Sequence, residues 1–276
     1  MLSRRYFIRA GFAAIAAGGL AACGNGSASS AAKSKKLTVA ASPSPHAEIL
    51  DDFAAPRLKQ QGITLKTKEY TDYIIPNQVT SSGEVDANYF QHINYLNNYN
   101  KENGTDLVGV AAIHYEPFGI YAGKSKDLKG IQDGAQIAVP NDPTNEGRAL
   151  LLLQQEKLIT LKDPDNLQAT PVDIAKNPHN IKFVEVEAAA VARQLQDVDF
   201  AVINGNYAIE AGMHVKDALA VEDKDGKAVK QYANYIVTTP DKKDDARVKA
   251  LVKALTSDDF KKYLSKTYDQ DVLPAF

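Results

Sequence analysis

The sequence predicts an α/β fold in two lobes, and three observations lead to that prediction. From Leu37 to the C-terminus, strand-like segments alternate with amphipathic helical segments, a pattern typical of sheets layered with helices. No repeat of fixed period accompanies this alternation. Two β-rich runs, residues 113–122 and 232–239, are natural places for the chain to cross between lobes, and we expect largely parallel sheets. The expected lobe 1 is residues 37–117 plus 237–276, and the expected lobe 2 is residues 118–236.

The first expected elements are two strands with a helix between them. "KLTVAAS" (36–42) is apolar enough for a buried strand, and "ITLKTKEY" (63–70) alternates with the period of two that a strand requires. Residues 45–62 predict an amphipathic helix that is bent or split near Pro56. Its expected inward side chains are Ile49, Leu50, Phe53 and Leu58.

The next expected elements lead to the crossing point. "DANYF" (86–90) predicts a short strand, and "HINYLNNYNKENG" (92–104) predicts a helix that ends at Gly104, because glycine readily adopts the left-handed conformation that closes helices. The run "LVGVAAIHYEPFGIYAG" is rich in β-formers and is interrupted at Pro117.

Strands and helices continue to alternate through the second half of the chain. The expected elements are strand 135–140, helix 143–159, strand 181–186, helix 188–196, strand 199–205 and strand 233–239. A C-terminal helical region then presents Val248, Leu251, Val252 and Leu255 on one face. Ser257 is expected to cap a last helix containing Phe260, Tyr263 and Leu264.

Composition limits the classes of function. Apolar residues make up 44% and charged residues 24% of the 276 residues, which is ordinary for a globular protein. The net charge of −2, without a Lys/Arg-rich block, gives no electrostatic case for binding nucleic acid. Cysteine occurs once, which excludes an intramolecular disulfide and a cysteine-based zinc cluster.

The first 22 residues have the organisation of an export signal. A basic stretch with Arg4, Arg5 and Arg9 precedes a short apolar segment rich in small residues. The ending "LAAC" resembles a bacterial lipobox, which implies that Cys23 is lipidated and becomes the first mature residue. An ordinary signal peptide with an incidental cysteine, or an uncleaved anchor, is the alternative.

Residues 23–36 are expected to hold the mature protein to the cell membrane through lipidated Cys23 and a flexible Gly/Ser/Ala tether, on the extracytoplasmic side. Two export routes remain open, because "SRRYFIR" resembles a twin-arginine motif but also serves as a plain basic region for general secretion. An exported, lipid-tethered, two-lobed α/β protein suggests a solute receptor.

Arg148 is the first candidate for contact with a ligand. It follows "VPNDPTNEG" in the first turns of an expected helix, where the helix dipole disfavours a cation. An anion there would be attracted by both the helix end and the bidentate guanidinium. Arg148 is therefore either a solvated surface residue or a carboxylate-binding residue, and Glu146 is expected to orient or partly neutralise it.

A second group of candidates lies in "NYFQHINY" (88–95), where several rings gather in a strand-to-helix turn. Alternation along a strand places Tyr89 in the core and Phe90 on the opposite side. Considered alone, His92 favours a structural or helix-capping role. Asn204 and Asn206 end a strand in "INGNY", and the local pattern does not decide which of them contacts ligand.

Long motifs in order along the chain identify a family resemblance. "HAEIL", "TDYIIPN", "GEVDANYFQHINYL", "HYEPFGIYA", "VPNDPTNEGRALLLLQ", "VDFAVINGNYAIEAG", "VEDKDGK" and "VLPAF" resemble the methionine-binding lipoproteins, the substrate-binding subunits of methionine ABC importers, over residues 37–276. The resemblance implies a two-lobe periplasmic-binding-protein fold of a type II-like kind, with the ligand cleft between the lobes. It also implies methionine as ligand, a permease and a cytoplasmic ATPase as partners, no cofactor, no enzymatic activity and a monomeric protein.

The resemblance assigns roles to particular residues. Arg148 would pair with the α-carboxylate of the ligand, and Asn145, Asn206 and Asn234 would fix its head group. The expected walls of the side-chain pocket are Tyr73, Phe90, His92 and Tyr95. Tyr115 and Phe118 depart from the aliphatic or Met residues common in the family, which affects the detail of the pocket.

Several alternatives remain at this point. Within the binding class, the ligand could be D-methionine, a methionine-containing dipeptide or another small amino acid. A metal-binding receptor would use the five histidines, but these are far apart in sequence and lack ligand spacing. An enzyme lacks a G-x-S-x-G, H-E-x-x-H or P-loop motif, and a structural lipoprotein would not need Arg148.

Overall fold

The computed structural model describes residues 35–223 and 227–276. The expected signal peptide (1–22), Cys23 and nearly all of the tether lie outside the described residues. The described residues belong to one compact unit. None of the helices in the described part of the chain has the length and apolar character needed to cross a membrane.

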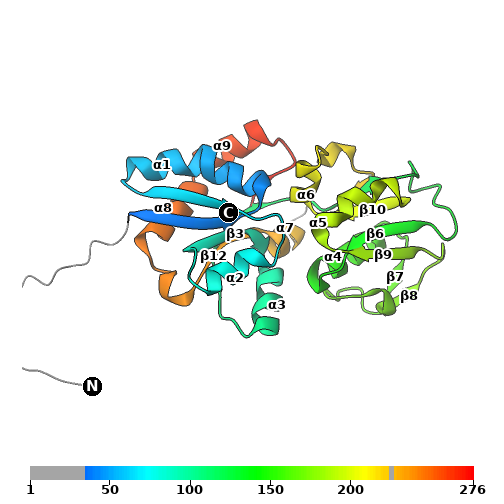
Figure 1. The fold of residues 1–276 in the computed structure, drawn as a ribbon. Helices are drawn as coiled ribbons and strands as arrows, with labels where there is room; N and C mark the ends of the chain where they lie inside the picture. Colours follow the sequence, from blue (N-terminus) through cyan, green and yellow to red (C-terminus); the bar gives the residue numbers. More distant parts are fainter. Residues whose placement is uncertain (1–34, 224–226) are drawn as a thin grey trace, which may run out of the picture. The chain divides into compact units, whose positions relative to one another are not determined.

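The first sheet has six strands in the order β13-β4-β12-β3-β1-β2, of which β3 and β12 are labelled in Figure 1. Its strands are β1 (Lys36–Ala41), β2 (Thr64–Glu69), β3 (Ala87–His92), β4 (Val108–Tyr115), β12 (Asn234–Thr238) and β13 (Leu273–Pro274). β1 pairs in parallel with β2 and β3, whereas β12 pairs antiparallel with β3 and β4. This sheet therefore combines two directions of pairing.

Helical segments cover the first sheet and supply its core. They are η1 (Pro43–Ala47), η2 (Ile49–Ala54), α1 (Ala55–Gln60), α2 (Ile75–Ser81), α3 (Ile93–Asn103), η6 (Pro240–Lys242), α8 (Ala246–Leu255) and α9 (Asp258–Thr267). The predicted inward residues of the first helical segment, including Phe53 and Leu58, are buried in this core. Gly104 closes α3 with φ of 63°, and the Ser257 side chain caps α9, as predicted.

The second sheet has five strands in the order β11-β5-β10-β6-β9. These are β5 (Gly119–Ala122), β6 (Gln136–Pro140), β9 (Lys182–Val186), β10 (Phe200–Ile203) and β11 (Ala220–Val221). Its helical segments are α4 (Pro143–Gln155), α5 (Ala188–Val191), η4 (Ala192–Gln196), α6 (Gly205–Glu210) and η5 (Val215–Asp217). Helix α7 (Lys227–Tyr232) packs instead against α3 of the first sheet. The small hairpin β7 (Thr160–Leu161) and β8 (Ile174–Lys176), with η3 (Pro171–Asp173) beside it, follows α4.

The prediction of an α/β fold is confirmed, but the prediction of largely parallel sheets is wrong. β5 pairs antiparallel with β10 and β11 in the second sheet, as β12 does with its neighbours in the first. Strands β5 and β12 each follow a passage between the sheets, and the short C-terminal strand β13 also pairs antiparallel with β4. The crossover that keeps successive strands parallel connects strands of one sheet, so a strand that enters from the other sheet is free to run against its neighbours.

Two segments of the chain pass between the sheets. The first is residues 116–118, between β4 and β5, and the second runs from Val221 to Asn234. Because β12 begins at Asn234, the whole of this strand belongs to the first sheet. The lobe boundaries given above stay a prediction.

Candidate functional site

All eight residues predicted to contact a ligand line one cavity. The free space inside the cavity is about 20 Å³, which is enough for about one water molecule. The predicted residues in its wall are Tyr73, Phe90, His92, Tyr95, Asn145, Arg148, Asn206 and Asn234. Gln91, Glu116, Asn204 and Gly205 complete the wall. The fold therefore brings the predicted residues together, while the role of each toward a ligand stays a prediction.

The wall draws on elements of both sheets. β3, α3, β12 and the loop before α2 supply the residues of the first group, which are Phe90, His92, Tyr95, Asn234 and Tyr73. α4, α6 and the end of β10 supply Asn145, Arg148, Asn206 and Asn204. Hydrogen bonds connect the two groups: the Tyr73 hydroxyl donates to Asn206 Oδ1 over 2.5 Å, and Tyr207 Oη donates to the carbonyl of Thr71 over 3.0 Å.

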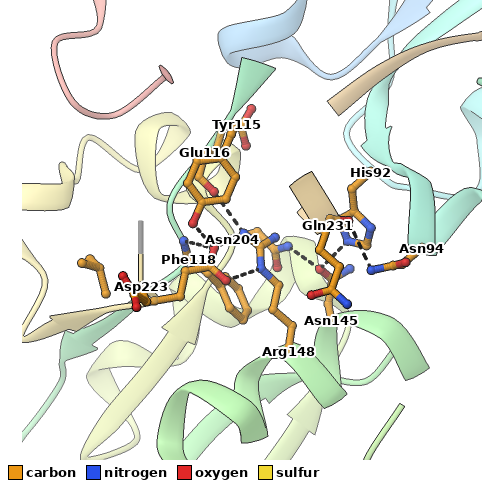
Figure 2. Close-up of polar contacts among 12 residues, drawn as sticks. His92, Asn94, Tyr115, Glu116, Phe118, Asn145, Arg148, Asn204, Asp223 and Gln231 are labelled. Atoms are coloured by element: carbon orange, nitrogen blue, oxygen red, sulfur yellow. Dashed lines mark hydrogen bonds and ion pairs between the residues drawn. The ribbon is translucent and has the colours of Figure 1, made fainter. Parts of the chain in front are cut away.

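Arg148 is buried and already has an acidic partner. Its Nε donates to Glu222 Oε2 over 2.9 Å, and its Nη2 donates to Glu222 Oε1 and, over 3.1 Å, to the carbonyl of Glu116. Burial disfavours the charged guanidinium, but the Glu222 carboxylate outweighs burial and raises the pKa of Arg148. The rings of Phe118 and Tyr232 lie 4.7 and 4.2 Å from its Cζ, close enough for cation–π attraction. Figure 2 shows Arg148 extending from α4 toward Glu116 and Phe118.

The expectation that Glu146 orients or neutralises Arg148 is wrong, because Glu222 has that role. Residues two apart on a helix point to different faces, so Glu146 is directed away from the guanidinium. It lies instead beside Glu185, and burial together with that second carboxylate raises the pKa of Glu146 to about 8. One oxygen of Glu146 is buried without a hydrogen-bond partner among the described residues.

Asn145 connects the start of α4 to both sheets. Its Nδ2 donates to Asp142, the residue whose side chain caps α4. Its Oδ1 accepts from Asn204 Nδ2 over 2.8 Å and lies 3.3 Å from His92 Nε2 (Figure 2). The Asn145 amide is therefore fully used by the protein, which favours a role in shaping the cavity.

His92 caps α3, as its residue type suggested. Its Nδ1 accepts from the backbone N–H of Tyr95 over 3.1 Å, so the proton of the neutral ring lies on Nε2 and points toward Asn145. Burial, together with the positive charge of Arg148, lowers the pKa of His92 to about 3. His92 is therefore a neutral donor at physiological pH.

Two buried amide atoms in the wall lack partners within the described residues. Asn204 Oδ1 is an acceptor without a donor, and Asn206 Nδ2 is a donor without an acceptor. A buried polar atom left unpaired costs about 1–3 kcal/mol, and such atoms beside a cavity are suited to bind a polar ligand. Both asparagines that the sequence left undecided thus line the cavity.

The opposite part of the wall is aromatic. The ring centroid of Tyr73 lies 5.7 Å from Phe90, 5.8 Å from Tyr95 and 5.0 Å from Tyr207. Tyr89 is fully buried in the core on the other side of β3, as the alternation predicted. Aromatic rings at these distances offer edges and faces suited to a polarizable sulfur.

A buried network of two histidines and a glutamate lies next to Asn234. The sequence did not predict this network. Glu116 Oε1 lies 2.7 Å from His114 Nε2 and 3.5 Å from His46 Nε2. His46 Nε2 also lies 3.2 Å from Asn234 Oδ1. The view that the histidines are dispersed is wrong for His46 and His114, whose ring centroids are 5.0 Å apart. Distance in sequence concealed this, because η1 and β4 meet only in the folded chain.

These three residues are the group in the described chain that could hold a metal ion. The protein itself already uses the atoms that would bind one. Tyr89 Oη bonds His114 Nδ1, and His114 Nε2 is within hydrogen-bond distance of Glu116. Burial lowers the pKa of His114 to about 3 and that of His46 to about 4, so both rings are neutral and hydrogen-bonded without a metal.

Glu222 and Tyr115 form a further part of the site that the sequence did not reveal. Glu222 accepts from the Tyr115 hydroxyl over 2.6 Å and from the backbone N–H of Phe118 over 3.0 Å. Tyr115 and Phe118 thus position the carboxylate that holds Arg148. The motifs "HYEPFG" and "VEDKDG" contain all three residues, but nothing in either motif indicates that they meet.

Two sheets joined by two passages, with a cavity walled from both, define a periplasmic-type solute-binding protein, which is a binding protein and not an enzyme. A sequence profile of the NlpA lipoprotein family matches residues 37–276. The chain belongs to the NlpA lipoprotein family.

Individual relatives agree with this assignment. The methionine-binding lipoprotein MetQ of Bacillus subtilis is 43% identical over 265 residues, covering 94% of both chains. Two solved structures each have a TM-score of 0.82 and 38% identity. One is the substrate-binding protein of a methionine transporter from Streptococcus pneumoniae, covering 88% of this chain and 96% of that one. The other is a nutrient-binding protein from Burkholderia cenocepacia bound to methionine, covering 87% and 100%.

Proposed function

We propose that this protein is a lipid-anchored, extracytoplasmic solute-binding protein that captures methionine and delivers it to an ABC importer. The observation that carries the proposal is the composition of the single cavity that unites the predicted residues. One guanidinium, two unpaired amide atoms and an aromatic wall meet there. Relatives named for methionine binding or methionine transport support the choice of ligand.

The α-carboxylate of methionine is assigned to Arg148. Glu222 occupies the Nε–Nη2 edge of the guanidinium, so the ligand carboxylate approaches through Nη1, for which no hydrogen bond is found among the described residues. Asn206 Nδ2, a buried donor without a partner, is placed in the same wall and adds a second hydrogen bond. The ligand thus binds to a guanidinium that is already held still by the protein.

The thioether side chain is assigned to the rings of Tyr73, Phe90 and Tyr95, beside His92. Contacts between sulfur and an aromatic ring contribute about 0.3–1.5 kcal/mol each. A set of rings therefore favours methionine over an aliphatic side chain of equal length. L-methionine and D-methionine share every group named here, so the choice between them is left to experiment.

Binding requires the cavity walls to separate. The free space of about 20 Å³ is far below the volume of a ligand with the nine heavy atoms of methionine. The walls come from both sheets, so separation of the two groups of residues opens the site, as in hinge closure around ligands. An enclosed, dry pocket is also what tight binding of so small a ligand demands.

The anchor, location and partners follow from the family and the N-terminal sequence. Cys23 is proposed as the lipidated residue, which holds the protein at the outer face of the cell membrane. A permease with a cytoplasmic ATPase is the proposed receiver of methionine. The protein is proposed to act as a monomer, because a solute delivered from one cavity needs no second copy.

Calorimetry on residues 24–276 tests the proposal, after bound ligand has been removed by unfolding and refolding. L-methionine, D-methionine and a methionyl dipeptide are titrated separately, with leucine as the matched control of similar size. We expect at least one methionine form to bind more tightly than about 100 μM, which corresponds to about 5.5 kcal/mol. Failure of all three to reach that affinity, or equal affinity for leucine, would refute the methionine assignment.

A further inference from the structure

A second cavity, the outer cavity, lies next to the aromatic wall of the first. It has about 70 Å³ of free space, and its wall includes Tyr73, Tyr95, Ala188, Ala189 and Tyr207. Tyr73 and Tyr95 also line the first cavity, so these two side chains separate the two spaces. The Tyr95 hydroxyl donates to the carbonyl of Tyr73 over 3.0 Å, and the two ring centroids are 5.8 Å apart. The two tyrosines therefore form one partition between the cavities.

Tyr207 packs against this partition from the second sheet. It belongs to α6, is 5% exposed and lines the outer cavity but not the first. Its ring centroid lies 5.0 Å from that of Tyr73, at an interplanar angle of 33°. Its hydroxyl donates to the carbonyl of Thr71 over 3.0 Å. Tyr207 therefore holds both the Tyr73 ring and the loop that carries this ring.

The packing around Tyr73 leaves its ring little freedom to move. The Phe90 ring centroid lies 5.7 Å away, and the Tyr73 hydroxyl donates to Asn206 Oδ1 over 2.5 Å. Asn206 and Tyr207 come from the second sheet and Tyr73 from the first, so the ring is held in this way only when the walls close. A ligand side chain that extends toward Tyr73 then meets a ring that Tyr207 supports from behind. Interiors packed in this way respond to a single added methylene.

We infer that Tyr207 is a positioning residue that limits the length of the ligand side chain, because it holds Tyr73 in place between the two cavities. This inference rests on the proposed function, which assigns the thioether to the rings of Tyr73, Phe90 and Tyr95. Without the Tyr207 ring, Tyr73 can shift into the outer cavity, and the first cavity gains room at its aromatic end. The ligands that Tyr207 excludes are amino acids with an apolar side chain longer than that of methionine.

Calorimetry with two ligands of different length tests this inference. Ethionine, used in the same configuration as the methionine that binds, is longer by one methylene at the far end of the thioether. Native protein is expected to prefer methionine by about 10–200-fold, which is the discrimination that one methylene provides in a fitted apolar pocket. Tyr207→Ala removes the ring and should lower this preference by at least about threefold. Tyr207→Phe keeps the ring and should stay within about threefold of the native preference.

A second tyrosine variant controls for general destabilisation, since the ratio of two affinities is insensitive to the loss of a distant core ring. Tyr99→Ala removes a ring that is 7% exposed and packs in a separate core cluster beside α3, and it should keep the native preference. If Tyr207→Ala does not fold, Tyr207→Leu replaces it and should also lower the preference by at least about threefold.

The possible outcomes distinguish this inference from the proposed function. A smaller change in the Tyr207 variant overturns the inference, as does native protein that binds ethionine and methionine equally well. An equal loss of preference in Tyr207→Phe and Tyr207→Ala overturns the assignment to the ring. All three results leave methionine binding itself intact. Native protein that binds neither ligand overturns the proposed function.

Discussion

Arg148 and Glu222, 74 residues apart in sequence, form a buried ion pair that joins α4 to the segment after β11. Both side chains are less than one-tenth exposed. The pair therefore has two tasks: it fixes the guanidinium beside the cavity, and it connects the start of the second passage to the helix that begins at the cavity wall.

Removal of Arg148 should affect stability and binding separately. Arg148→Ala leaves Glu222 buried without its cation, which costs about 3–5 kcal/mol of unfolding free energy. The double variant Arg148→Met/Glu222→Gln removes both charges and should recover much of that stability, measured by urea unfolding. Neither variant should bind methionine within 100-fold of native affinity. Native-like affinity in the double variant would show that the carboxylate binds elsewhere.

Gly205 should tolerate no side chain. Gly205→Ala places a Cβ 2.5 Å from Glu116 Cβ and 3.2 Å from the carbonyl of Pro117, so we expect a loss of about 1–3 kcal/mol, as for other overpacked sites. Methionine affinity should fall as well, because Glu116 must move. Gly130→Ala is the matched control, since a Cβ there meets nothing within 4 Å. Equal unfolding midpoints for the two variants would contradict the close approach.

Acid should destabilise the protein through its buried histidines. The folded-state pKa of His114 is about 3, below its ordinary value of 6.5, so the unfolded chain binds the extra proton first as pH falls. The contribution of the neutral ring is complete above about pH 6.5 and is lost progressively below it. The glutamine of His114→Gln cannot become charged. Between pH 7.5 and 5, the unfolding free energy of this variant should therefore fall by about 2 kcal/mol less than that of the native protein. His179→Gln, in a loop, should keep the native pH dependence, and an unchanged slope in His114→Gln would refute the assignment.

Rising pH should destabilise the protein through Glu146, which is the opposite of the effect of the buried histidines. Its folded-state pKa is raised from 4.5 to about 8, so the folded protein retains a proton that the unfolded chain releases. This contribution is complete below about pH 4.5 and declines as pH rises through 8. Glu146→Gln should therefore be more stable than native at pH 8 and equal to it near pH 4.5, measured by thermal unfolding. Glu156→Gln, half-buried at the end of the same helix, serves as control, and a native-like decline in Glu146→Gln would contradict the raised pKa of Glu146.

The sequence was sufficient for features that depend on nearby residues. Ser257 as a cap, Gly104 as a helix end and the opposite orientations of Tyr89 and Phe90 all follow from local backbone geometry. The family motifs were sufficient to predict residues that line one cavity. Each motif places neighbouring side chains at a single strand end or helix start.

The features that the sequence did not reveal depend on pairing between distant segments. No local signal links Arg148 to Glu222 or His46 to His114, since a carboxylate or imidazole is compatible with many neighbours. Glu146 was the nearest acidic residue in sequence, yet helical geometry directs it to Glu185. The prediction of parallel strands failed at β5 and β12 for the same reason. Each of these strands pairs with strands of the sheet that it enters, and those strands are distant in sequence.

The tightness of the cavity has a consequence for kinetics. Free space of about 20 Å³ is bridged by the Tyr73–Asn206 and His92–Asn145 contacts, which must part before any solute passes. Exchange of solute then has an upper rate set by how often these contacts open, whatever the solute concentration outside. The residence time of a captured molecule is accordingly a property of the protein's own opening, and a docking partner that pulls the two walls apart would shorten it without competing for the site.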